Sequence, residues 1–192
     1  LLNALAGAIP VSSGSVARAP TDLRIAFVQQ ELEADESESV LQVLARRTDV
    51  KKANDGLANA AELLASDYTE ATATKYSAAL EFWESVGAAD FEARARDIAA
   101  RVRLSDENLR QPTSALSGGQ AARVELAVAL LHTAPILFLD EPTNNLDSEG
   151  IALLESSLLE PHVGVVIVSH DRALLDRVAT SILELDDHSR DG

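Results

Sequence analysis

Two adjacent carboxylates follow an apolar run in the second half of the chain. Residues 136–139 are continuously apolar, as in buried parallel strands, and Asp140 and Glu141 come directly after them. The carboxyl ends of parallel strands form the edge at which open α/β folds bind ligands. Two neighbouring acids repel each other there unless a cation lies close, so the pair indicates a bound cation. An acidic loop after a buried strand is the alternative.

A second group of residues, Ser117, Gly118, Gly119 and Gln120, directly precedes a predicted helix. Glycines let a backbone approach a ligand closely. The free amide groups and the positive end of the helix dipole favour an anion such as phosphate. An ordinary serine N-cap explains the same residues without any ligand.

A histidine and a glutamine end two further apolar runs. His170 follows residues 163–168, and Gln30 ends a run of β-branched and aromatic residues that starts at residue 23. A histidine at the same sheet edge as the two acids can hydrogen-bond a phosphate or a catalytic water, although a lone histidine is more often structural. We therefore expect His170 to lie near Asp140 and Glu141.

The elements that must position these groups alternate between strands and helices. Residues 1–6 fit the end of a helix stopped at Gly7. Alternation of strand and helix is typical of βαβ units on a parallel sheet, which predicts an α/β fold. We predict strands at 23–30, 136–140, 163–168 and 182–185, and helices at 119–132, 148–159 and 172–178.

The middle of the chain has a different pattern. Between about residues 37 and 104 apolar residues recur at helical spacing, which predicts four helices. Breaks are expected near residues 49–55, 66–69 and 87–90.

This change of pattern divides the chain. We predict an α/β core made of residues 1–36 and 111–192, with residues 37–110 as a helical subdomain. Three aromatic residues of the subdomain are expected to pack inside it, with contacts of an extended arm as the alternative. These are Tyr76, Phe82 and Trp83.

The composition and charge of the chain limit the classes of partner that it can bind. The formal net charge of −15 opposes phosphate backbones, so we expect no DNA partner. A run of arginines is interleaved with acids and fits a solvated helix face better than an RNA-binding surface; it comprises Arg94, Arg96, Arg101, Arg103 and Arg110. The chain has no cysteine, which leaves the redox compartment open. It has no apolar run of roughly 18 to 20 residues and no basic flank of a signal peptide at its start, so we expect no membrane domain and a cytoplasmic location.

Taken in order, the motifs resemble those of the ATP-binding cassette family. Residues 116–120 resemble its signature motif, residues 136–141 its Walker B strand and glutamate, and residues 145–147 its D-loop. His170 matches the switch histidine and Gln30 the Q-loop glutamine. The run Glu-Pro-Thr-Asn-Asn-Leu-Asp, with Asn145 in place of the usual histidine, and Ser-His-Asp-Arg at residues 169–172 resemble the ABC-F branch. The resemblance implies a P-loop NTPase-like parallel sheet with an inserted helical subdomain.

The resemblance also implies roles for matching residues. Asp140 would hold Mg²⁺ through water, with Gln30 beside it, and Glu141 would act as general base. Gln30 and His170 would sense the γ-phosphate of ATP. A second cassette would hold that ATP. This chain would contact the same ATP through Ser117, Gly118, Gly119, Gln120 and Asp147.

The phosphate-binding lysine loop of that family has no counterpart in these residues. No run Gly-x-x-x-x-Gly-Lys-Ser/Thr occurs, and residues 1–7 resemble the family's sequence directly after that loop. We therefore expect an N-terminally truncated cassette without the N-terminal β part, with negligible ATP affinity by itself.

Three functions remain open from the sequence. The first is an ABC-F ATPase acting on the ribosome, in translation, ribosome protection or antibiotic resistance. The second is the ATPase subunit of a membrane transporter, against which the Asn144–Asn145 pair speaks. The third is a non-catalytic interaction module, which the missing lysine loop favours.

Overall fold

The structure is a computed structural model that describes residues 1–21, 23–28, 35–159 and 163–184. Gln30 and Leu185 lie outside the described residues. The described elements are α1 (Leu2–Leu5), β1 (Ile25–Val28), α2 (Val40–Arg47), α3 (Val50–Ser66), α4 (Glu70–Ser85), α5 (Phe91–Arg101), α6 (Asp106–Arg110), the short 3₁₀ helix η1 (Thr113–Ala115), α7 (Gly118–Leu131), β2 (Ile136–Asp140), α8 (Ser148–Leu158), β3 (Gly164–Val168) and α9 (Arg172–Val178).

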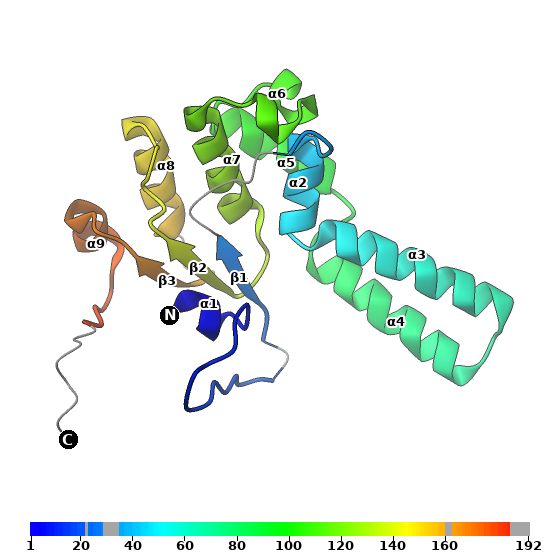
Figure 1. The fold of residues 1–192 in the computed structure, drawn as a ribbon. Helices are drawn as coiled ribbons and strands as arrows, with labels where there is room; N and C mark the ends of the chain where they lie inside the picture. Colours follow the sequence, from blue (N-terminus) through cyan, green and yellow to red (C-terminus); the bar gives the residue numbers. More distant parts are fainter. Residues whose placement is uncertain (22, 29–34, 160–162, 185–192) are drawn as a thin grey trace.

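The three strands form a parallel sheet in the order β1-β2-β3 (Figure 1). Ile25 pairs with Ile136, and Ile136 pairs with Gly164, so all three strands end at the same edge. Helices connect β1 to β2 and β2 to β3, which is the connection that parallel strands require. The predicted α/β fold is confirmed.

Most predicted elements lie where the sequence placed them, and one does not. The four predicted helices are α2 to α5, although the first break is only the turn at Thr48 and Asp49. The predicted strand at residues 182–185 is wrong in its described part, because residues 182–184 belong to no strand. A strand needs a hydrogen-bonded neighbour, and β3 pairs only with β2 among the described residues. Accordingly Ile182 is 71% exposed and Leu183 82% exposed.

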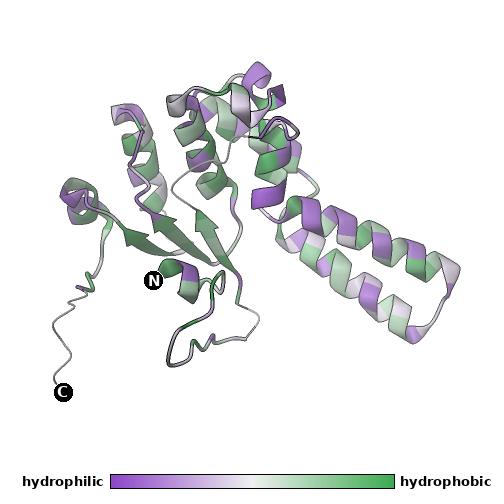
Figure 2. Cartoon of the chain, in the orientation of Figure 1, coloured by the Kyte–Doolittle hydropathy of each residue, from purple (hydrophilic) through white to green (hydrophobic). Residues whose placement is uncertain are grey.

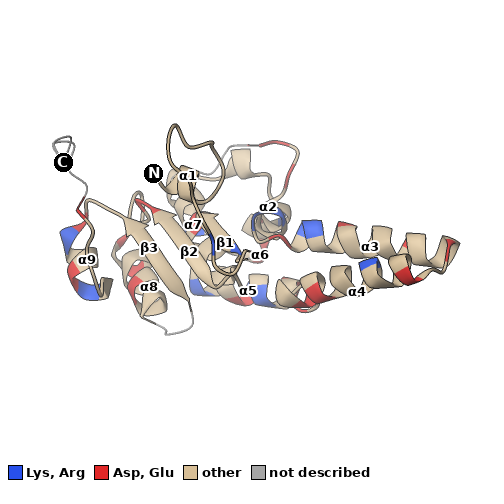
Figure 3. Cartoon of the chain, turned by 90° about the horizontal axis from the view of Figure 1, so that it is seen from below, with Lys and Arg blue, Asp and Glu red and all other residues tan. Residues whose placement is uncertain are grey.

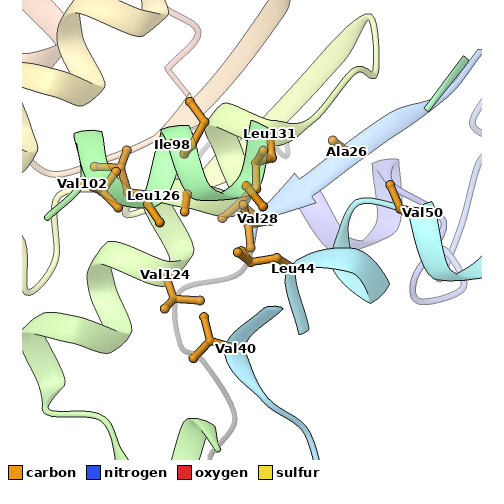
Figure 4. Packing of buried hydrophobic residues seen from close by; sticks show 14 of the residues in the cluster. Ala26, Val28, Val40, Leu44, Val50, Ile98, Val102, Val124, Leu126 and Leu131 are labelled. Carbon is orange, nitrogen blue, oxygen red and sulfur yellow. The ribbon is translucent and has the colours of Figure 1, made fainter. Parts of the chain in front are cut away.

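The core lies between the sheet, α7 and the helices α2 and α5. Buried side chains from these elements form one cluster, in which Leu44 of α2 lies near Val28 of β1 and Val40 faces Val124 of α7 (Figure 4). Figure 2 shows that the strands are hydrophobic along their length, whereas the helices carry hydrophilic outer faces. Burial of this apolar surface stabilises the sheet and the second half of α7.

Helices α3 and α4 form a hairpin that projects from the rest of the molecule (Figure 1). No residue of α4 is buried. At its base the Trp83 indole donates to Asn54 Oδ1 at 2.7 Å, and Phe82 and Trp83 pack against the core cluster. Tyr76 is half-buried further out. Phe82 and Trp83 therefore serve in packing at the base of the hairpin.

Charges of both signs are interspersed along the helices (Figure 3). Three of the five clustered arginines pair with acids, in the pairs Arg94–Asp90, Arg96–Glu92 and Arg103–Glu149. These pairs agree with a solvated face. No helix of the described residues is long and apolar enough to cross a membrane.

Candidate functional site

The loops that follow β2 and β3 lie side by side at the carboxyl edge of the sheet. Asp140 is the last residue of β2 and pairs in register with Val168, the last residue of β3. The Glu141 amide then donates to the Val168 carbonyl at 2.8 Å, which extends the pairing by one bond. This bond places Glu141 directly beside Ser169 and His170.

The Glu141 carboxylate contacts the loop after β3 at both oxygens. Oε1 lies 3.3 Å from Nε2 of His170. Oε2 accepts from the His170 amide at 3.2 Å and from the Ser169 hydroxyl at 3.5 Å. The Glu141 side chain is only 13% exposed, whereas that of His170 is 97% exposed. The arrangement fixes a carboxylate that can accept a proton and leaves an imidazole open to a ligand.

The backbone at this loop is unusual. Glu141 has φ of 48° and Asn145 has φ of 60°. Asparagine tolerates the left-handed region, but for a glutamate it costs on the order of 1 kcal/mol. Strain of this kind concentrates at functional sites because it aims a side chain that a relaxed turn would not aim.

Asp140 and Glu141 line a pocket of about 190 Å³ between β2, α7 and α8. Its wall includes Gly118 of α7 and Asn145, and Leu139 and Leu154 contribute apolar surface. Pocket and sheet edge thus bring residues of the signature-like and Walker B-like segments together.

The Asp140 carboxylate makes no hydrogen bond or ion pair with the chain, as far as the described residues extend. One carboxylate with free oxygens at the pocket fits Mg²⁺, which keeps most of its waters and takes one or two protein oxygens. No group of three or more histidine and acidic residues gathers in the described part of the chain, so this is not a preformed protein cage. Gln30, the other predicted metal residue, lies outside the described residues.

The Ser117 loop is built as a capping box. The Gln120 amide donates to Ser117 Oγ at 3.3 Å, and the Ser117 amide donates to Gln120 Oε1 at 2.9 Å. Gly118 and Gly119 are exposed, and a side chain at either would meet no atom within 4 Å. The loop therefore presents open backbone to an approaching molecule, while the Gln120 side chain is already used for capping.

Asp147 is held on two sides. Its Oδ1 accepts from the Gly150 amide at 2.8 Å, which caps α8, and its Oδ2 accepts from Arg123 of α7 at 2.5 Å. The Gly150 amide and then the Arg123 guanidinium lower the pKa of this carboxyl below its ordinary value. Asp147 therefore ties the loop after β2 to the helix that starts at Ser117.

Sequence reasoning missed two residues that shape this site. Ser169 bonds the Glu141 carboxylate, and Arg123 holds Asp147. Ser169 directly precedes the predicted His170, which offered a signal. Arg123 falls one turn after Ser117 to Gln120 on the predicted helix, but its partner is distant in the sequence, so spacing alone gave no indication.

The motifs and the fold agree with similarities to known proteins. Residues 1–144 match the family model described as ABC transporter. The energy-dependent translational throttle protein EttA of Mycobacterium tuberculosis is 35% identical over 167 residues, covering 86% of this chain and 30% of that protein. The ABC transporter F family member 5 of Arabidopsis thaliana is 29% identical over 194 residues, covering 95% of this chain and 27% of that protein. The chain thus spans less than a third of the length of either relative.

Solved structures give the same fold. An ATP-binding subunit of an ABC transporter superposes with a TM-score of 0.60 at 17% identity, covering 92% of this chain and 65% of that one. A dimeric bacterial ABC transporter cassette superposes with a TM-score of 0.51 at 22% identity, covering 82% of this chain and 57% of that one. The family match covers most of the chain, and the relatives agree with its ABC-F-like motifs. The chain therefore belongs to the ATP-binding cassette family, as an ABC ATPase domain of the ABC-F type.

Proposed function

We propose that this chain is part of a cytoplasmic ABC-F ATPase that hydrolyses ATP together with a second cassette and acts on the ribosome. The observation that carries the proposal is the contact between Glu141 and His170 at the carboxyl edge of the sheet. It joins a fixed carboxylate to an exposed imidazole beside Asp140, whose carboxylate has no partner among the described residues.

In this proposal Glu141 is the general base. Two hydrogen bonds and the His170 ring hold its carboxylate, which takes a proton from the water that attacks the γ-phosphate. Such proton transfer contributes roughly 10²- to 10⁴-fold in rate. His170 is exposed on its outer side and supplies a donor to the γ-phosphate while its Nε2 stays near Glu141.

Asp140, together with Gln30, would hold Mg²⁺ through water. The bound ion would neutralise phosphate charge during transfer. The support for this assignment is the free carboxylate of Asp140 at the pocket, next to the pinned carboxylate of Glu141.

A second cassette is the proposed partner for the Ser117 loop. Ser117, Gly118 and Gly119 are exposed at the start of α7, where open amides favour a phosphate. Gln120 and Asp147 support this surface from behind, since both side chains bond within the chain. A dimeric cassette among the similar structures supports such pairing.

Action in translation rests on the relatives. One of them is named a translational throttle protein. Ribosome protection and antibiotic resistance are finer proposals within the same class. The ATPase subunit of a membrane transporter is the competing function, and it predicts co-purification with a membrane partner instead of ribosomes.

The test uses the full-length protein that contains this chain. Hydrolysis of ATP is measured with and without purified ribosomes, and binding is followed by sedimentation with ATP or ADP. We expect ATP hydrolysis and co-sedimentation that depends on ATP. Hydrolysis without any ribosome binding contradicts the ribosomal part of the proposal, and no hydrolysis in either condition contradicts the enzymatic part.

A further inference from the structure

Several hydrogen bonds attach the base of the α3–α4 hairpin to the rest of the molecule at the end of α4. The Ser85 carbonyl accepts from the Thr133 hydroxyl at 2.9 Å and from the Arg24 guanidinium at 3.2 Å. The Gly87 carbonyl accepts from Arg94 at 2.7 Å, and the same Arg94 nitrogen lies 3.3 Å from the Val86 carbonyl. Carbonyls at a helix end lack partners within the helix, so these donors satisfy them.

The donors also contact the C-terminal end of α7. Arg94 donates through its other terminal nitrogen to the Leu131 carbonyl, the last residue of α7, at 3.4 Å. Thr133 follows α7, and its own carbonyl accepts from Arg24 at 3.3 Å. One end of α7 is therefore joined to the hairpin, while its other end begins at Ser117.

The geometry at Gly87 shows how closely Arg94 fits. Gly87 has φ of 65°, and a Cβ atom at this position would collide with the Arg94 guanidinium. Asp90 also pairs with Nε of this guanidinium at 2.9 Å. Arg94 thus occupies one defined position between α4 and α7.

We propose that the α3–α4 hairpin and α7 form one rigid unit, with Arg94, Thr133 and Arg24 as the junction that joins them. A helix of 14 residues is about 21 Å long, so α7 reaches from this junction to the Ser117 loop. Given the proposed function, a partner that displaces the hairpin tip also displaces the loop that meets the second cassette. Arg94 is then a positioning residue for that loop.

The chain contains no cysteine, so two introduced cysteines can be spin-labelled without a background. Tyr68→Cys places a label at the exposed hairpin tip, and Ser114→Cys places the other in the exposed segment before Ser117. Pulsed electron paramagnetic resonance then gives the distribution of distances between them. A rigid unit gives a narrow distribution.

Arg94→Ala is expected to broaden and shift that distribution. Since α3 has 17 residues and is about 25 Å long, a tilt of about 10° at its base moves the tip by about 4 Å. Thr133→Val, which removes one hydroxyl donor at similar volume, is expected to give a smaller change of the same kind. Gly87→Ala should act like Arg94→Ala, because it displaces the guanidinium. If Arg94→Ala fails to fold by circular dichroism, Thr133→Val and Gly87→Ala carry the test.

The matched control is Arg96→Ala, on the same helix. Arg96 has a comparable pair with Glu92 but no bond to α4 or α7 among the described contacts. An unchanged distribution in the junction variants overturns the proposal, and so does an equal broadening in Arg96→Ala. The measurement uses no nucleotide or ribosome, so its failure is distinct from a failure of the proposed function.

Discussion

Nε2 of His170 lies 3.3 Å from Oε1 of Glu141, although 29 residues separate them in the chain. The parallel pairing of β2 and β3 produces this contact, because Asp140 and Val168 end their strands in register. A mostly buried carboxylate and an exposed ring thus meet at the edge where the two loops leave the sheet.

Removing the imidazole is expected to slow hydrolysis without unfolding the domain. In the full-length protein, His170→Ala should lower kcat by roughly 10²-fold, the usual effect of losing one preorganised donor near a reacting group. The ring is almost fully exposed, so the melting temperature should change little. Steady-state hydrolysis and a thermal melt check both parts, and unchanged kcat would remove His170 from the mechanism.

The buried ion pair between α2 and α7 should be sensitive to loss of one partner. Arg47 donates to both Glu125 oxygens, at 2.7 and 3.0 Å, and both side chains are mostly buried. Burial raises the pKa of Glu125, and Arg47 opposes that rise. Glu125→Ala leaves a buried guanidinium unpaired and should lower the free energy of unfolding by about 3 to 5 kcal/mol.

The control for this pair is the double variant Arg47→Met with Glu125→Leu. Replacement of both charges by apolar groups of similar volume is often neutral, so this variant should regain most of the lost stability. Urea denaturation measures both variants. A single variant as stable as the native chain would show that the pair is not buried.

Stability should fall in mild acid because of His132. Burial lowers the pKa of His132 from an ordinary 6.5 to about 4, against the opposing effects of Asp49 and the Arg47 carbonyl. Between pH 6.5 and pH 4 the unfolded chain binds a proton that the folded chain does not, so the free energy of unfolding falls as the pH falls. The full loss below pH 4 is about 3 kcal/mol.

Substitution of His132 separates this effect from the titration of carboxylates. His132→Gln should flatten the part of the stability curve between pH 6.5 and pH 4 relative to the native chain. Denaturation at several pH values provides the curves. Equal slopes in His132→Gln and the native chain would refute the assignment.

The 192-residue chain by itself is expected to bind ATP very weakly. Its residues include no lysine loop to wrap and neutralise the phosphates. Asp140, Glu141 and His170 provide two acids and one ring, which do not replace that loop. Calorimetric titration of the chain with Mg-ATP should show no saturable heat, and a micromolar dissociation constant would contradict this expectation.

The sequence predicted the strands and helices near the site well because their patterns are local. The apolar run before Asp140 and the serine N-cap at Ser117 each predict an element from a few adjacent residues. The strand at residues 182–185 was predicted from its composition alone, but a strand forms only beside a partner, which local pattern does not supply. Non-local partners such as Arg123 for Asp147 also depend on how elements pack, so they became visible only in the structure.

The most direct test of the account is hydrolysis by the full-length protein carrying Glu141→Gln, compared with Glu149→Gln, an exposed acid at the start of α8. If Glu141 is the general base, single-turnover hydrolysis should fall by roughly 10²- to 10⁴-fold in Glu141→Gln, while ATP binding persists and Glu149→Gln behaves as the native protein. Native hydrolysis rates in Glu141→Gln would contradict the central claim that this carboxylate, held beside His170, performs the chemistry.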